Sequence, residues 1–287
     1  MKQIQWFPGH MKKALIEMQN SVKIVDIVLE IVDARAPIAS SNPELKRIIN
    51  NKPHLVILNK QDLADSKKTE EFVKYYKSQN IDSFVCSIMN LDFKKLKEKC
   101  NEILKEKFAK ERAKGLKPRP IRALICGIPN VGKSSFINKV AKRKAANVGN
   151  KPGVTKSQQM IKIDRDFELL DTPGVLWPKF EDINVARNLA LLNSIKMDIL
   201  PKNELVNYLI TLLINEYPNT LNKRYGDVEI PINDEEDVLT VLNSIATRRG
   251  LVQAGNILDI DRAIDLVLKE FADGILGKFT LEEPVNG

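Results

Sequence analysis

Residues 127–135 place two glycines, a lysine and two serines at a spacing that can bind phosphate. Their sequence is GIPNVGKSS, which fits G-x-x-x-x-G-K-[ST], the phosphate-binding loop. A short apolar run (121–126) precedes this segment and a helical pattern follows it, as the motif requires. Gly127 and Gly132 let successive backbone amides face one phosphate, and the start of the helix adds a favourable dipole.

The polar residues of this loop have distinct expected roles. Lys133 is expected to neutralise the β- and γ-phosphates of a nucleotide, and the Ser134 hydroxyl to hold Mg²⁺. The other loop residues expected to contact the nucleotide are Asn130, Val131, Gly132 and Ser135. The alternative is a glycine turn that happens to carry a lysine, and the strand-loop-helix context disfavours it.

A second motif, Asn-Lys-Gln-Asp at residues 59–62, follows the apolar run 54–58. It fits N-K-x-D, which selects guanine. The Asp62 carboxylate can accept hydrogen bonds from N1–H and from the 2-amino group, a donor pair that adenine does not present. Asn59 and Lys60 are expected to brace the loop and cover the base. Ser87 stands where a second base-contacting loop usually has Ser-Ala-Lys, and only this serine matches.

The third motif is Asp-Thr-Pro-Gly at residues 171–174, a D-x-x-G element. Asp171 is expected to hold Mg²⁺ through a water, and the Gly174 amide to sense the γ-phosphate. Thr155, in the segment Pro-Gly-Val-Thr, is the expected switch threonine and a further Mg²⁺ ligand. Val175 stands where Ras-like enzymes carry a glutamine. That glutamine orients the water that attacks the γ-phosphate, so another group must do this here.

Composition indicates a soluble globular protein. The chain has 287 residues, 43% of them hydrophobic, with a mean hydropathy of -0.23. That length predicts one to two domains. No apolar run approaches the roughly 20 residues of a membrane span, and the first residues do not resemble a signal peptide. The three cysteines lack metal-ligand spacing and indicate reduced thiols in a cytoplasmic protein.

Charge is distributed unevenly along the chain. Residues 1–178 hold 34 Lys and Arg against 19 Asp and Glu, whereas residues 179–287 hold 11 against 18. A basic part beside an acidic part suggests contact with a polyanion through one face. RNA fits better than a membrane, because no amphipathic anchor accompanies the charge. The alternative is a solvated, lysine-rich surface.

Apolar runs that alternate with helical patterns predict a doubly wound, mostly parallel sheet. Strands are expected at 24–33, 54–58, 83–88, 121–126, 160–163 and 167–170, and helices at 12–21, 43–50, 69–79 and 93–114. Beyond residue 178 the pattern is helical, at 185–196, 203–216, 235–248 and 261–274. We expect a nucleotide-binding domain at residues 1–178 and an all-helical domain at residues 179–287.

The motifs occur in an unusual order, because the base-selecting motif precedes the phosphate-binding loop. In this respect the chain resembles the circularly permuted GTPases, and specifically the YlqF/YawG family. The resemblance covers essentially the whole chain. It is carried by WFPGHM (6–11), DARAP (33–37), NKQD, GIPNVGKSS, PGVT, DTPG, RRG (248–250), DRA (261–263) and FADGILG (271–277).

The resemblance implies a circularly permuted Ras-like P-loop domain with a smaller helical C-terminal domain. It implies GTP hydrolysis to GDP during late assembly of the large (50S) ribosomal subunit, whose precursor and rRNA would be the partners. A monomer is expected. Arg248 and Arg249 would contact rRNA phosphates; alternatively, they are solvated charges that suit the end of a helix.

The resemblance also nominates His10 to orient the attacking water, with Lys133 and Thr155 as the other catalytic residues. The alternative for His10 is a packed histidine in a turn. Asn130 matches the asparagine that binds K⁺ in cation-activated GTPases; alternatively, it only favours the turn of its loop.

Two other functions stay open. An RNA chaperone or placeholder could use GTP only to set its affinity, with incidental hydrolysis. A membrane- or tRNA-associated GTPase is disfavoured, because no anchor and no modification site is present in the sequence.

Overall fold

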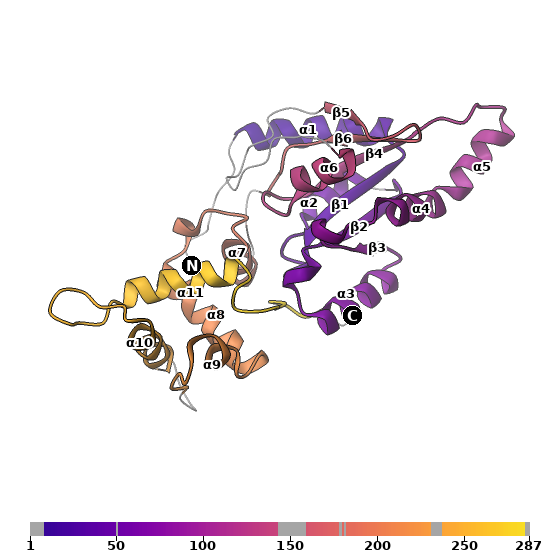
Figure 1. Ribbon diagram of the computed structural model, residues 1–287. Helices are drawn as coiled ribbons and strands as arrows, with labels where there is room; N and C mark the ends of the chain where they lie inside the picture. Colours follow the sequence, from indigo (N-terminus) through magenta and orange to yellow (C-terminus); the bar gives the residue numbers. More distant parts are fainter. Residues whose placement is uncertain are drawn as a thin grey trace.

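A mixed six-stranded sheet and a group of helices make up the protein (Figure 1). The computed structural model describes residues 9–49, 51–142, 159–177, 180, 182–230 and 237–284.

The sheet has the strand order β3-β2-β1-β4-β6-β5. All neighbouring pairs are parallel except β5 with β6. The bounds of the strands are β1 Ile27–Asp33, β2 His54–Asn59, β3 Asp82–Val85, β4 Ile121–Cys126, β5 Gln159–Lys162 and β6 Phe167–Asp171. Every residue of β1 is buried, as expected for a parallel strand covered on both faces. The predicted doubly wound, mostly parallel sheet is confirmed, although β1 begins three residues later than expected.

Chain order and spatial order differ in the way that a circular permutation requires. β4, which leads into the phosphate-binding loop, lies in the middle of the sheet between β1 and β6. The three strands β1, β2 and β3 precede it in the chain and form one half of the sheet. A Ras-like sheet has this arrangement when its original chain termini are joined and new termini are created in another loop.

Six helices accompany the sheet over the described residues before β5. They are α1 Gly9–Ile24, α2 Pro43–Ile49, α3 Ser66–Ser78, α4 Phe93–Ile103, α5 Lys105–Ala113 and α6 Lys133–Ala141. Side-chain caps explain the starts of α3 and α4: Asp65 accepts from Lys67 N and Lys68 N, and Asp92 accepts from Lys94 N and Lys95 N. The single helix expected over 93–114 is wrong, because the helix is divided at Leu104, where ψ is 1°.

The helices that follow β6 are here called the helical region. They are α7 Ile183–Leu191, α8 Lys202–Glu216, α9 Thr220–Tyr225, α10 Asp237–Arg249 and α11 Ile260–Ala272, with a short 3-10 helix, η3, at Met197–Ile199. The sequence did not predict α9, and it extended α7 too far. α7 ends because Asn193 adopts a left-handed φ of 57° and Ser194 N–H donates back to Leu189 O at 2.8 Å.

The core of the sheet continues into the helical region. Buried apolar residues of β1, β4, α7, α8, α10 and α11 belong to one contiguous cluster. After α11, the chain returns to the sheet, and its last described residues lie beside α3 (Figure 1), where Glu283 pairs with Lys68. The boundary expected between residues 178 and 179 therefore stays a prediction.

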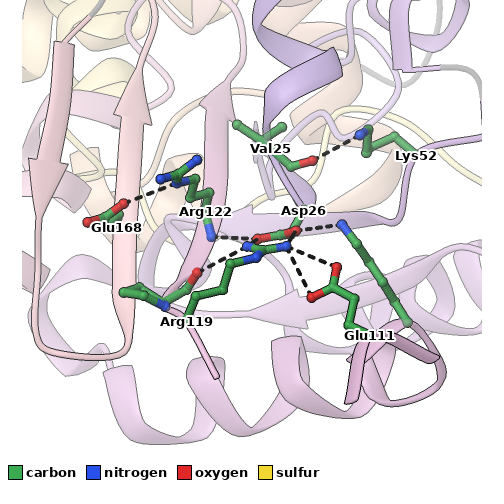
Figure 2. A network of polar contacts seen from close by, with 9 residues as sticks. Val25, Asp26, Lys52, Glu111, Arg119, Arg122 and Glu168 are labelled. Carbon is green, nitrogen blue, oxygen red and sulfur yellow. Dashed lines mark hydrogen bonds and ion pairs between the residues drawn. The ribbon is translucent and has the colours of Figure 1, made fainter. Parts of the chain in front are cut away.

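A buried carboxylate fastens the connection between α5 and β4 to the beginning of β1 (Figure 2). Asp26 accepts two hydrogen bonds from the Arg119 guanidinium, both at 2.7 Å, and one from Arg122 N at 2.9 Å. Lys107 of α5 forms an ion pair with the same carboxylate, and Arg119 also pairs with Glu111. Burial by itself would raise the pKa of Asp26, but these donors lower it to about 2.

We expect Asp26→Asn to reduce the free energy of unfolding by about 2 kcal/mol at neutral pH, since Lys107 and Arg119 then lose their shared partner. Their partial exposure keeps the loss below that of a fully buried pair. Because the pKa of Asp26 is lowered, its contribution is complete above the usual value of 3.8 and is lost as the pH falls towards 2. Urea unfolding between pH 7 and pH 3 measures both effects.

Glu168→Gln is the matched control, because it removes the more exposed ion pair with Arg122 (3.4 Å) at the same end of the sheet. It should change stability by less than about 0.5 kcal/mol. Equal losses for the two variants would contradict a special role for Asp26.

Candidate functional site

The chemically distinctive loops of the chain meet at the carboxyl edge of the sheet. Asn59 ends β2, Asp33 ends β1, and Asp171 ends β6. Gly127 directly follows β4, and Ser87 comes two residues after β3. In open α/β sheets this edge is where ligands bind.

Both glycines of the phosphate-binding loop occupy positions where any side chain would be strained. Gly127 has a φ of 146°, and a Cβ there would lie 2.4 Å from Ile31 O. Gly132 has a φ of 100°, and a Cβ there would lie 2.5 Å from Asn59 Nδ2. The loop therefore packs directly on the strand end of β1 and on the N-K-x-D motif, and it delivers the chain into α6.

Lys133 and Asp171 form the charged centre of the site. Lys133 Nζ donates to Gly127 O at 3.0 Å and to Ile128 O at 2.8 Å, so the ammonium group lies inside the loop. Burial lowers the pKa of Lys133 to about 8, partly offset by the nearby Asp171. Burial likewise raises the pKa of Asp171 to about 6, against the influence of Lys133.

The Asp171 carboxylate fits a cation site. Both of its oxygens are buried, and no side chain in the described ranges donates a hydrogen bond to them. A buried carboxylate without such donors is costly unless a cation or water satisfies it. Ser134 lies one residue beyond Lys133 at the start of α6 and is partly buried. The Asp171 carboxylate and the Ser134 hydroxyl would both offer oxygen ligands, which Mg²⁺ prefers.

The D-x-x-G segment lies against the phosphate-binding loop. A Cβ on Gly174 would lie 2.9 Å from Lys133 Nζ and 3.0 Å from Pro129 N, so the two segments approach each other closely at this glycine. Val175 N–H donates to Gly127 O at 3.4 Å, and the Val175 side chain is buried. That side chain cannot orient a water molecule.

Asn42 also holds this segment. Its Nδ2 donates to Val175 O at 2.8 Å, while its Oδ1 caps α2 by accepting from Glu44 N at 2.9 Å. The start of the helix expected over residues 43–50 is confirmed. The contact with Val175 was missed, because nothing in the local sequence indicates a partner 133 residues away.

The guanine motif is anchored to the phosphate-binding loop through its first two residues. Asn59 Nδ2 donates to Val131 O at 2.8 Å, and Lys60 Nζ donates to Asn130 O at 2.9 Å. Lys60 adopts a left-handed φ of 61°, which turns the chain into the short 3-10 helix η1, Gln61–Leu63. Asp62 lies in η1 and is exposed, as a carboxylate that meets a base must be.

Asp33 is a residue that sequence reasoning missed, although the DARAP motif contains it. Its buried carboxylate accepts from Arg35 N, Nε and Nη2 at 2.9–3.1 Å, and Lys60 Nζ lies 2.8 Å away. Burial opposes ionisation, but Arg35 and Lys60 hold the pKa of Asp33 well below its usual range. The sequence did contain a sign of this pair, because Asp33 and Arg35 stand two positions apart at the end of an expected strand.

The remaining expected residues have different placements. Ser87 is buried and caps the 3-10 helix η2, Ile88–Asn90, by accepting from Met89 N. Asn130 has a φ of 62°, and its Nδ2 donates to Asn193 O, between α7 and η3, at 2.5 Å. Ser135 follows in α6 and is partly buried.

Two expected catalytic groups lie outside what can be described. Thr155 falls outside the described residues. His10 belongs to the first turn of α1, but its side chain is outside the described part.

Arg248 and Arg249 end α10, far along the chain from the site. Arg248 donates to Asp227 O at 3.2 Å, and Arg249 donates to Arg224 O at 3.0 Å and lies over the Tyr225 ring. Both residues are exposed.

A permuted sheet with a phosphate-binding loop, a guanine motif and D-x-x-G at one edge defines a P-loop GTPase. Residues 122–244 match the family described as "50S ribosome-binding GTPase". The chain is 45% identical to ribosome biogenesis GTPase A of Bacillus cereus over 98% of its length and 94% of that protein. It is also 45% identical to the Priestia megaterium protein of the same name, covering 97% of that protein.

A solved structure agrees with the sequence relatives. GDP-bound YlqF from Thermotoga maritima aligns with a TM-score of 0.67 and 26% identity, covering 94% of this chain and all of that one. The chain therefore belongs to the ribosome biogenesis GTPase A family, and it is a GTP hydrolase of ribosome biogenesis. Among the described residues, no helix is both long and apolar enough to cross a bilayer.

We expect Asp171→Asn to abolish most of the Mg²⁺-dependent gain in GDP and GTP affinity, because the amide cannot supply the charge that a hard cation prefers. Titration of a fluorescent guanine nucleotide with and without Mg²⁺ measures this gain, and we expect it to fall at least about tenfold.

Asp166→Asn is the control. Its carboxylate lies in the turn before β6, is largely exposed and pairs with Lys97. It should leave the Mg²⁺ effect unchanged. If Asp171→Asn keeps the full Mg²⁺ effect, Asp171 is not a ligand of the cation.

Proposed function

We propose that this GTPase binds the precursor of the large (50S) ribosomal subunit in its GTP-bound form and leaves it after hydrolysis. The observation that carries this proposal is the short path between the phosphate site and the helical region. The D-x-x-G segment leads into α7 within nine residues of Gly174, and Asn130 of the phosphate-binding loop donates to Asn193 just beyond α7. A displacement of Gly174 by the γ-phosphate would therefore be transmitted to the helices through a short connection.

Each nucleotide contact has a proposed residue. Lys133 neutralises the β- and γ-phosphates, and Asp62 selects guanine. Ser134, Thr155 and Asp171 hold Mg²⁺, which supplies charge neutralisation for phosphoryl transfer. The orphaned, buried Asp171 carboxylate supports the last assignment.

His10 is the proposed water-positioning residue. The burial of the Val175 side chain supports the need for such a group, and family resemblance selects this histidine. We further propose K⁺ at Asn130. Its position in the phosphate-binding loop supports this assignment, because a cation there would supply positive charge near the phosphates.

The helical region, proposed as a domain covering residues 179–287, contacts rRNA through Arg248 and Arg249. These two exposed arginines are the last residues of α10. The acidic balance of this region makes binding by charge alone unfavourable, so the basic nucleotide-binding part (1–178) shares the contact. A cytoplasmic monomer completes the proposal.

The runner-up is an RNA chaperone or placeholder that uses GTP only to set its affinity. An arrangement in which Val175 replaces the usual glutamine favours slow hydrolysis, which either function tolerates. Assembly supported by a hydrolysis-deficient variant would distinguish this alternative.

Co-sedimentation with precursor particles should be strong with a non-hydrolysable GTP analogue and weak with GDP. Replacing Arg248 and Arg249 by Ala should weaken the GTP-state binding and reduce its log–log salt slope by about 0.7–0.9 for each rRNA phosphate that is no longer neutralised. Arg262→Ala, which removes another exposed arginine of the helical region, is the control. Equal pelleting with both nucleotides would refute GTP-controlled binding.

His10→Ala should lower GTP turnover by about 100-fold, within the range of a positioned proton-transfer or water-orienting group, and change nucleotide affinity less than twofold. The other histidine, His54, provides the matched control: it lies at the opposite end of β2, where its Nε2 is 3.0 Å from Glu30. His54→Gln should leave turnover unchanged. Joint loss of turnover and affinity in His10→Ala would instead indicate a structural residue.

A further inference from the structure

The residues that follow α11 lie against the end of η1, the 3-10 helix that contains Asp62. We call residues 274–283 the return segment. Phe279 N–H donates to Leu63 O at 3.0 Å, at the last residue of η1. Gly274 lies so close that a Cβ there would be 2.5 Å from the Leu63 side chain. Asp62 is thus one residue away from two contacts with the return segment.

Thr280 is the central residue of this contact, and it is fully buried. Its hydroxyl accepts from Asp65 N at 3.2 Å and donates to Ala34 O at 3.5 Å. Asp65 is the residue that caps α3. Thr280 therefore joins the residues just after η1 to the loop that follows β1.

The return segment also holds the loop after β1 directly. Leu281 N–H donates to Arg35 O at 2.7 Å, and the Glu282 carboxylate accepts from Ile38 N and Ala39 N. Arg35 is the partner of Asp33, which in turn holds Lys60.

The position of the return segment depends on the helical region. Tyr217, which directly follows α8, donates its hydroxyl to Thr280 O at 3.0 Å and accepts from Thr280 N at 2.9 Å. The Phe279 ring packs on the rings of Tyr217 and Phe271, with centroids 5.0 and 6.0 Å apart. A shift of α8 or α11 would therefore reach Thr280 and Phe279 first.

Asp62 needs such support from outside its own motif. In the described part of the chain, its carboxylate forms no hydrogen bond or ion pair, so only the backbone of η1 positions it. Asn59 and Lys60 fix the beginning of that backbone on the phosphate-binding loop. Leu63 and Asp65, which follow Asp62, are fixed by the return segment.

We propose that the return segment is part of the guanine-recognition site, with Thr280 and Phe279 as positioning residues for Asp62. Guanine affinity then depends on how the helical region is seated on the sheet, by a route separate from Gly174. This proposal rests on the assignment of Asp62 to guanine, which is part of the proposed function.

The test is a double-mutant cycle for GDP binding to the purified full-length chain. Thr280→Val keeps the shape of the side chain but leaves Asp65 N–H without its acceptor, and it should weaken GDP binding about five- to tenfold. In the Asp62→Ala background the same change should weaken GDP binding less than twofold, because the carboxylate that it positions is gone. Tyr217→Phe should reproduce the pattern with a smaller effect.

Two controls accompany the cycle. Thr280→Ser keeps the hydroxyl and should restore GDP affinity to within twofold of the unmodified chain. Lys278→Ala removes an exposed side chain of the same segment and should have no effect.

An equal loss from Thr280→Val in both backgrounds would show a general destabilisation and overturn the proposal, as would no loss in either. If Asp62→Ala itself leaves GDP affinity unchanged, the assignment of Asp62 fails instead. Because no ribosomal particle enters the assay, its result is independent of the co-sedimentation experiment.

Discussion

The nucleotide site depends on one buried carboxylate that is shared by two cations. Asp33 holds Lys60, which donates to the phosphate-binding loop, and it holds Arg35, whose carbonyl receives the return segment. A buried ionised carboxylate is tolerable only with such partners, so the three side chains form a single unit. The unit fixes the base-selecting and phosphate-binding loops relative to each other before any nucleotide is bound.

Permutation alters which parts of the chain must be fastened together. The three strands of the base-selecting half precede β4, so the connection over residues 114–120 passes from one half to the other. Asp26 ties that connection to the beginning of β1, at the edge of the sheet opposite the nucleotide. The two halves of the sheet are thus joined at both edges, by Asp26 at one and by Asp33 at the other.

Sequence patterns predicted the sheet well, because its strands are apolar runs and its loops carry motifs fixed by phosphate and guanine chemistry. They failed where the cause is tertiary. The division of the helix at Leu104, the helix α9 and the contact of Asn42 with Val175 have no local signal. The guanine motif was recognised from four residues, yet the hydrogen bond between Asp65 and Thr280, 215 positions apart, could not be inferred from pattern.

The return segment also bears on the order in which the protein is made. Chains are synthesised from the amino end, and N-terminal units generally fold first. β1, β2 and the guanine motif leave the ribosome early, whereas Thr280 follows Asp65 by 215 residues. The contacts that complete the guanine motif therefore form only after nearly all of the described chain has been translated. During synthesis, the base-selecting loop is therefore present before the return segment that packs against it.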